Sequence, residues 1–159
     1  MKVLLVDDDD DVMLEALEKA IRRNGYEVEL AKNGDEGWER FQKGNHPVVV
    51  TDLRMPESLD GLDLLEKIRK QNSLTQVIII TGHGGKDDAI RALNLEAFRY
   101  IEKGSSEMSR DLSDAIRLAF ERCEEEGGDT DFTSLLSNPE KRSSIEKIRE
   151  LAKEIPVVL

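Results

Sequence analysis

Residues 2–12 are KVLLVDDDDDV, in which a run of four apolar residues leads directly into five aspartates. The apolar run, residues 3–6, is continuous rather than alternating, which is typical of a strand buried on both faces. Residues 48–50 (VVV) and 77–80 (VIII) have the same character. These three segments predict the centre of a parallel β-sheet.

Amphipathic segments separate the predicted strands. Apolar residues repeat at helical spacing over 13–21, and Asn24-Gly25 supplies a C-terminal cap for that helix. Strand and helix alternating five times predict an α/β fold with a doubly wound, five-stranded parallel sheet. The other predicted elements are strands at 27–31 (at the sheet edge) and 99–102, helices at 34–43, 60–71 and 108–126, and a helix marked by Ala89, Ile90 and Leu93.

The composition excludes several classes of protein. The chain has 159 residues, with 34 acidic and 23 basic side chains and a formal net charge of −11. This acidic excess argues against direct nucleic-acid binding and membrane binding, because both need a basic face. Cys123 is the only cysteine, which excludes an intrachain disulfide and a cysteine-based zinc site. With no long apolar run and no signal-peptide pattern, we expect a soluble, cytoplasmic protein.

Polar residues follow the predicted strands at the edge where a doubly wound sheet binds ligands. Asp7 and Asp8 follow the first strand, Asp52 the third, Thr81 the fourth and Lys103 the fifth. Three clustered carboxylates repel one another unless a cation is present, and hard oxygen ligands suit Mg²⁺. A metal beside a lysine and a threonine can also hold a phosphoryl group, which one carboxylate can accept as a nucleophile.

Four segments together carry a family resemblance. Residues 2–12 (KVLLVDDDDDV), 48–56 (VVVTDLRMP), 77–84 (VIIITGHG) and 100–104 (YIEKG) resemble, in this order and spacing, the receiver domain of two-component response regulators. The likeness covers residues 1–126. It implies a flavodoxin-like sheet with strand order 2-1-3-4-5. It also implies a phosphorelay signalling module rather than an enzyme, although one that assists its own phosphorylation and dephosphorylation.

The resemblance implies a role for each acidic residue. Asp52 would be the phosphoacceptor, which attacks the phosphohistidine of a sensor histidine kinase or a histidine phosphotransfer protein. Asp7, Asp8 and Asp52, with the backbone carbonyl of Arg54, would hold Mg²⁺ or Mn²⁺. Asp8 would be a direct ligand, and Asp7 would act more through water.

The resemblance also implies how the signal leaves the site. Lys103 would pair with one phosphoryl oxygen and Thr81 would bond another. Tyr100 would be the aromatic switch that turns inward as Thr81 moves. The surface made by the fourth helix, the fifth strand and the fifth helix would then be recognised by a downstream effector domain or protein.

Three features depart from the family pattern. Gly104 follows Lys103 where the family usually has proline. We therefore expect no cis peptide bond here, a different geometry of the loop and a less firmly held lysine. Residues 55–61 (MPESLDG) form a loop one residue longer than the common MPxMDG form, which we expect to alter kinase docking or hydrolysis. Arg54 lies two residues after Asp52, and we hypothesise that it tunes the lifetime of the phosphoryl bond.

Other polar residues have simpler interpretations. We interpret residues 9–11 as solvated aspartates near a helix start. His46 and His83 are interpreted as exposed loop residues, because no other histidine completes a metal site. Cys123 is interpreted as a passive small residue on the fifth helix.

Two other functions compete with the phosphorylated receiver. A flavin or nucleotide enzyme of the same sheet type needs a Gly- or Thr-rich phosphate loop, whereas VDDDDDV repels phosphate unless a metal is bound. A degenerate receiver could instead act as a phosphorylation-independent dimerisation or interaction scaffold. The retention of Asp52, Thr81 and Lys103 argues against this scaffold.

The C-terminal part has a different character. We predict a receiver domain over 1–126, a linker over 127–137, and a helix with the start of a further segment over 138–159. Residues 135–159 faintly resemble the lead-in to the AAA+ domain of bacterial enhancer-binding activators. We hypothesise either a receiver and linker fragment of a longer regulator or a stand-alone receiver with a helical tail. An apolar stripe in the helix should pack on the receiver or on a second chain as a homodimer: Ile145, Ile148, Leu151 and Ile155.

Overall fold

The computed structural model of the protein describes residues 1–8, 12–82 and 84–127. Within these residues the strands form a five-stranded parallel sheet in the order β2-β1-β3-β4-β5. The predicted sheet and its strand order are therefore confirmed. The strands are β1 (Lys2–Val6), β2 (Glu27–Ala31), β3 (Val48–Asp52), β4 (Gln76–Thr81) and β5 (Arg99–Glu102).

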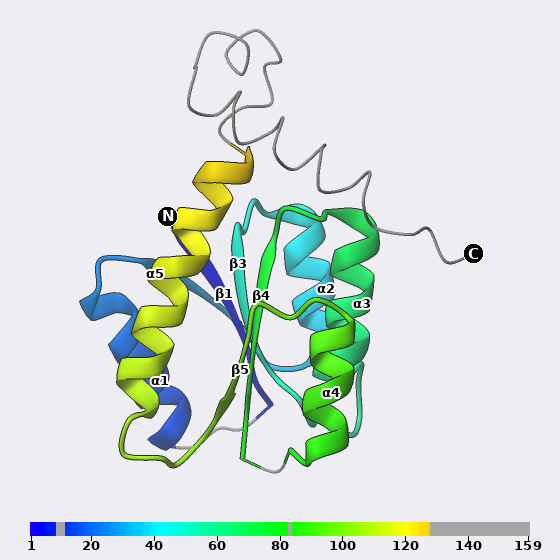
Figure 1. Cartoon of the computed structure of the whole chain (residues 1–159), viewed down its shortest axis with the longest axis horizontal. Helices are drawn as coiled ribbons and strands as arrows, with labels where there is room; N and C mark the ends of the chain where they lie inside the picture. The colour runs from blue at the N-terminus through cyan, green and yellow to red at the C-terminus, as the bar shows by residue number, and fades with distance from the viewer. Residues whose placement is uncertain (9–11, 83, 128–159) are drawn as a thin grey trace, which may run out of the picture. The chain divides into compact units, whose positions relative to one another are not determined.

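Five helices cover the two faces of the sheet in the described part of the chain. Figure 1 shows α1 and α5 on one face and α2, α3 and α4 on the other. Each helix connects parallel strands or follows the last one, as a doubly wound sheet requires. The helices are α1 (Val12–Arg23), α2 (Gly34–Lys43), α3 (Gly61–Gln71), α4 (Lys86–Asn94) and α5 (Met108–Gly127).

The core lies on both faces of the three central strands. β3 and β4 are buried at every residue, and β1 is buried at every residue after Lys2. Burial on both faces explains why these segments are continuous apolar runs. On α5 the predicted apolar face is buried against the sheet at all six positions: Met108, Leu112, Ala115, Ile116, Ala119 and Phe120.

The ends of several helices follow from local sequence. The side chain of Asn33 caps α2 by accepting a hydrogen bond from the backbone N–H of Glu36 at 2.8 Å. Asp60 caps α3 in the same way. After α1, Gly25 has a φ of +87°, a left-handed conformation that favours glycine and confirms the predicted cap.

Helix α4 is oriented differently from what its apolar residues suggest. Ala89, Ile90 and Leu93 correctly mark the helix, but Ile90 is 46% exposed and Leu93 is 62% exposed. The residue of α4 that is fully buried is Ala92. The small side chain of Ala92 packs in the core with the α2 and α3 side of the sheet, which leaves the larger apolar residues on the outer surface.

The chain divides into two compact units, Met1–Glu124 and Glu125–Leu159. Apart from Gly127, which ends α5, the predicted linker and the predicted C-terminal helix with its apolar stripe lie outside the described residues. The domain boundaries therefore stay predictions. None of the described helices combines the length and the apolarity that a bilayer crossing requires.

Candidate functional site

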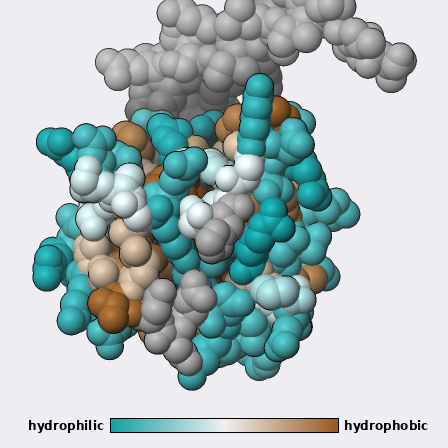
Figure 2. Space-filling view, turned by 90° about the horizontal axis from the view of Figure 1, so that it is seen from below, coloured by the Kyte–Doolittle hydropathy of each residue, from teal (hydrophilic) through white to brown (hydrophobic). Residues whose placement is uncertain are grey.

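The parallel register brings the predicted site residues to one edge of the sheet. Val6 of β1 is aligned with Thr51 of β3, so Asp7 lies beside Asp52 at the ends of neighbouring strands. β5 ends alongside β4, one residue before Lys103. This edge is the lower one in Figure 1, and Figure 2 views it directly as a mainly hydrophilic surface.

Three carboxylates converge at this edge. One oxygen from each of Asp7, Asp8 and Asp52 lies within 4.8 Å of the others. Asp7 and Asp52 are buried, and Asp8 is exposed. Buried like charges at such separations are unfavourable without a balancing cation, and carboxylate oxygens are the ligands that Mg²⁺ and Mn²⁺ prefer. The donor set therefore fits the predicted metal.

Lys103 provides one positive charge beside these carboxylates. Its ammonium nitrogen lies 2.7 Å from Asp7 Oδ2 and 3.2 Å from Asp52 Oδ2. The side chain is 10% exposed. Burial by itself lowers the pKa of Lys103, but the hydrogen bond and charge of Asp7, together with the charge of Asp52, raise it above the usual value. The ammonium is therefore held in its charged form between the two carboxylates.

The residue after Lys103 departs from the family pattern as expected. No cis peptide bond occurs in the described residues, and Gly104 adopts a φ of +87°. The backbone N–H of Lys103 donates to the Thr81 carbonyl at 2.9 Å. The two carboxylates and this backbone bond position Lys103 here, and the expectation that it is held less firmly than in the family stays a prediction.

Asp52 is positioned by the backbone around it. Its Oδ1 accepts a hydrogen bond from the N–H of Leu53 at 2.7 Å, which leaves Oδ2 beside Lys103. Gly61 begins α3 and donates its N–H to the Leu53 carbonyl at 2.8 Å. A Cβ on Gly61 would collide with the Asp52 carbonyl, so this close approach requires glycine.

Thr81 and Tyr100 lie together near the ends of β4 and β5. Thr81 is buried, and the Tyr100 hydroxyl is buried without a hydrogen-bond partner among the described residues. The hydroxyl lies against Gly84, where the Thr81 methyl is also close. Burial raises the pKa of Tyr100, and the carboxylates of Asp88 and Glu102 raise it further. The Tyr100 hydroxyl therefore lies inward in this structure, while the predicted inward turn as Thr81 moves stays a prediction.

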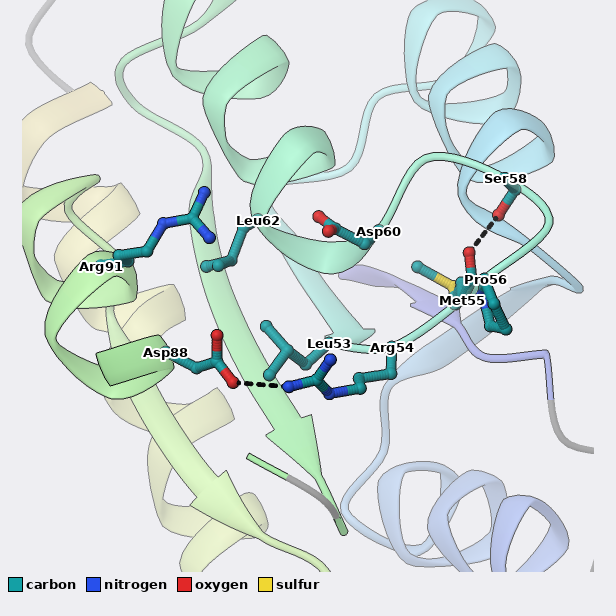
Figure 3. A pocket seen from close by; sticks show the side chains of 9 residues that line it. All are labelled: Leu53, Arg54, Met55, Pro56, Ser58, Asp60, Leu62, Asp88 and Arg91. Carbon is teal, nitrogen blue, oxygen red and sulfur yellow. Dashed lines mark hydrogen bonds and ion pairs between the residues drawn. The ribbon is translucent and has the colours of Figure 1, made fainter. Parts of the chain in front are cut away.

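The Arg54 side chain forms an ion pair with Asp88 of α4. Its Nη2 lies 3.0 Å from Asp88 Oδ2 on α4, as Figure 3 shows, and its side chain is 61% exposed. A cavity of about 280 Å³ opens beside this ion pair, between the loop after β3 and α4. Asp60 and Arg91 also line it. The partner of Arg54 could not be predicted, because Asp88 lies 34 residues away in sequence.

The longer loop over 55–61 is held on the start of α2. Ser58 Oγ accepts a hydrogen bond from the Gly34 N–H at 3.0 Å. The N–H of Leu59 is 3.4 Å from an Asp35 carboxylate oxygen. A Cβ on Gly34 would collide with the Leu59 carbonyl, so glycine is needed at this position. The sequence analysis identified the extra residue but missed these anchoring contacts.

His46 corrects one prediction. It is buried, not exposed, and its Nε2 lies 2.6 Å from Glu29 Oε2. Its ring stacks near Phe41, with the ring centroids 6.5 Å apart. The lack of further histidines argued against a metal site but did not show whether His46 is buried, which depends on its contacts with Glu29 of β2 and Phe41 of α2.

The other interpreted polar residues have mixed outcomes. His83 and residues 9–11 lie outside the described residues. Cys123 is partly buried on α5, and its thiol lies 3.3 Å from the Pro47 carbonyl. This packing contact agrees with a passive role for the thiol.

Comparisons with known proteins agree with this geometry. The model of the response regulator receiver domain matches residues 3–117. Chemotaxis protein CheY1 of Helicobacter pylori is 39% identical over 107 residues, which are 65% of this chain and 85% of CheY1. Response regulator protein PilR of Pseudomonas aeruginosa is 31% identical over 161 residues, which cover 99% of this chain but 35% of PilR.

A solved structure shows the same fold. The response regulator receiver domain protein from Clostridium thermocellum aligns with a TM-score of 0.69 and 37% identity, over 76% of this chain and 94% of that chain. Its likeness extends the sequence match to the arrangement of the strands and helices. On the family match, the relatives and the fold, this chain belongs to the response regulator receiver domain family of two-component signalling.

Proposed function

We propose that this receiver accepts a phosphoryl group on Asp52 in a metal-dependent reaction. The donor would be the phosphohistidine of a sensor histidine kinase or of a histidine phosphotransfer protein. One observation carries the proposal: the carboxylates of Asp7, Asp8 and Asp52 converge within 4.8 Å, and Lys103 reaches two of them.

The charge balance of the site supports a divalent cation. Three carboxylates and one ammonium carry −3 + 1 = −2 charges, which one divalent cation balances. Asp7, Asp8 and Asp52, with the backbone carbonyl of Arg54, would hold Mg²⁺ or Mn²⁺. When bound, the cation would neutralise the carboxylates and the phosphoryl oxygens that approach them.

The residues of the chain provide the remaining parts of the transfer. A carboxylate oxygen of Asp52 bonds to phosphorus while the phosphorus–nitrogen bond of the donor breaks. The electron pair of that bond stays on the donor imidazole, which then takes up a proton, and Asp52 becomes an acyl phosphate. Lys103 lies 3.2 Å from Asp52 Oδ2, so its ammonium is near enough to pair with a phosphoryl oxygen formed there.

The output would follow from a shift between two arrangements of the chain. The acyl phosphate carries about two negative charges where the Asp52 carboxylate carried one, which favours the arrangement that brings Thr81 and Lys103 closest to it. Tyr100 would follow Thr81. The surface of α4, β5 and α5, where Leu93 is exposed, would then bind an effector domain, an effector protein or a second copy of the chain in the cytoplasm.

A longer regulator is the favoured context for the effector. The match to PilR runs over 99% of this chain, so it includes the C-terminal residues, and it covers 35% of PilR. This supports the interpretation of residues 127–159 as a linker and the start of a further segment. The charged pair of Asp52 and Lys103 argues against the alternative of a degenerate scaffold, which would not need it.

Acetyl phosphate tests the proposal. With Mg²⁺, we expect the full chain to gain the mass of one phosphoryl group in intact-mass spectrometry, and Asp52→Asn to gain none. Asp114→Asn, an exposed change on α5, is the matched control and should react like the wild type. An adduct on Asp52→Asn, or none on the wild type, would contradict the proposal.

We further propose that Arg54 tunes the lifetime of the acyl phosphate. Arg54 lies two residues after Asp52, and the family resemblance implies that this position is beside the path of the attacking water. Arg54→Ala should change the dephosphorylation rate, whereas Arg91→Ala, across the same cavity, should not. Equal rates for wild type and Arg54→Ala would rule out this role.

A further inference from the structure

The carboxylate of Asp88 joins two loops beside the site. Its Oδ2 lies 3.0 Å from Arg54 Nη2, and Figure 3 shows this ion pair at the side of the cavity. The same oxygen is 3.4 Å from the backbone N–H of Gly85, the residue that caps α4. One side-chain oxygen therefore connects the loop after Asp52 with the turn before α4.

The turn that Asp88 holds is also the surface on which Tyr100 rests. The Tyr100 hydroxyl contacts Gly84, the residue before Gly85, and lies so close that a Cβ on Gly84 could not fit. That hydroxyl has no hydrogen-bond partner among the described residues. Within the described part of the chain no hydrogen bond fixes the hydroxyl, and the glycine turn is a surface against which it rests.

We propose that Arg54 and Asp88 act as positioning residues that set the inward position of Tyr100 through the turn of Gly84 and Gly85. This Arg54–Asp88 link would give Asp52 a second route to Tyr100, besides the one through Thr81. The direction of signalling along this route rests on the function proposed above, whereas the positioning of Tyr100 by Arg54 and Asp88 is independent of that function.

The Arg54–Asp88 ion pair can respond to a change of charge at Asp52. Phosphorylation replaces the single negative charge of Asp52 by about two, two residues from Arg54. The Arg54 side chain is 61% exposed, and exposed ion pairs are weak, so its guanidinium can exchange Asp88 for a phosphoryl oxygen. The Asp88 carboxylate then loses its ion-pair partner, and the turn of Gly84 and Gly85 against which Tyr100 rests can move.

The electrostatics of Tyr100 show that both residues act on it. Burial raises the pKa of the Tyr100 hydroxyl, and the negative charge of Asp88 raises it further. The positive charge of Arg54 opposes this rise. Both charges are therefore near enough to the hydroxyl to change its environment.

Fluorine NMR of a single tyrosine tests the link. The chain has two tyrosines, and Tyr26→Phe leaves Tyr100 alone while keeping a ring that can stack on Phe120. With 3-fluorotyrosine in this background and no phosphodonor, Asp88→Asn should move the Tyr100 resonance toward its position in the urea-unfolded chain. Arg54→Gln should move it in the same direction, and the double variant no further than Asp88→Asn alone.

Control variants separate positioning from a general effect of charge. Asp87→Asn makes the same charge change in the same turn of α4, and it should leave the resonance unchanged. Arg54→Lys keeps the positive charge and should restore most of the wild-type position. The proposal is overturned if Asp88→Asn behaves like Asp87→Asn, or if the shifts of Arg54→Gln and Asp88→Asn add.

The readout also distinguishes this proposal from the proposed function. If acetyl phosphate modifies Asp52 but Asp88→Asn does not move the Tyr100 resonance, the Arg54–Asp88 link fails and the phosphoacceptor stands. If the variants move the resonance but Asp52 gains no phosphoryl group, the phosphoacceptor fails and the link stands.

Discussion

Two polar clusters on the same sheet pair an acid with a base at nearly the same distance. At the carboxyl edge, Lys103 lies 2.7 Å from Asp7. On the α2 side of β2, His46 lies 2.6 Å from Glu29. In both clusters the basic side chain is largely buried. Neither burial nor pair distance distinguishes the clusters from each other.

Charge balance does distinguish them. Glu29 is one carboxylate with three basic partners, because Lys2 and Arg40 lie 3.4 Å and 3.2 Å from it in addition to His46. At the carboxyl edge, one ammonium is shared by two carboxylates, and a third carboxylate lies beside them. Among the described residues the basic partners of Glu29 outnumber it, whereas the carboxylates of the Asp7 cluster outnumber their single ammonium. This excess of two negative charges distinguishes the carboxyl edge from the Glu29 cluster and is the kind of electrostatic perturbation that concentrates at functional sites.

The largest expected effect is at the carboxyl edge. Lys103→Met removes the ammonium and leaves two buried carboxylates facing each other, which should lower the free energy of unfolding by about 3–5 kcal/mol. Urea unfolding without divalent cations measures this loss. Lys43→Met, an exposed lysine in an i,i+4 pair, is the control and should change little. Equal losses for the two variants would contradict the buried pairing.

Magnesium should stabilise only one of the clusters. At about a hundred times its dissociation constant, Mg²⁺ should raise the free energy of unfolding by ~2.7 kcal/mol, because it binds the folded chain alone. Asp8→Asn should lose most of this rise, while Glu29→Gln should keep it. Urea unfolding with and without Mg²⁺ measures the difference. A rise that survives in Asp8→Asn would place the cation elsewhere.

The two clusters should also lose their contributions to stability at opposite ends of the pH range. The pKa of Lys103 is raised, so its contribution is present below the unfolded value of 10.5 and is lost as pH rises through the native value. The pKa of Glu29 is lowered, first by the hydrogen bond with His46, so its contribution is present above 4.5 and is lost at lower pH.

Thermal unfolding across pH tests this assignment. Lys103→Met should reduce the loss of stability at high pH and leave the loss at low pH unchanged. Glu29→Gln should reduce the loss of stability at low pH and leave the loss at high pH unchanged. The same change in both variants would show that the two clusters are not separate.

The smallest effect is expected from Arg40→Met. Glu29 keeps His46 and Lys2 when this exposed guanidinium is removed, so the carboxylate stays balanced. The midpoint of urea unfolding should move far less than in Lys103→Met. A comparable shift would mean that the Glu29 cluster is not complete without Arg40.

The prediction of the fold succeeded where the signal is local. Continuous apolar runs identified β1, β3 and β4, and helical spacing identified the buried face of α5. The carboxylates were predicted because residues after parallel strands share one edge. His46 was missed because its burial depends on contact with Glu29, 17 residues earlier in the chain. Ile90 and Leu93 mark a helix by their spacing, but the spacing did not show that they lie outside.

The sequence by itself determined the elements, the sheet and the edge at which Asp7, Asp52 and Lys103 meet. Periodicity and the geometry of parallel strands are sufficient for these. Tertiary structure alone decided the partners of polar side chains, such as Asp88 for Arg54 and Gly34 for Ser58. These partners lie on segments distant in sequence, and hydrogen bonds act only at short range, so packing must first bring them together.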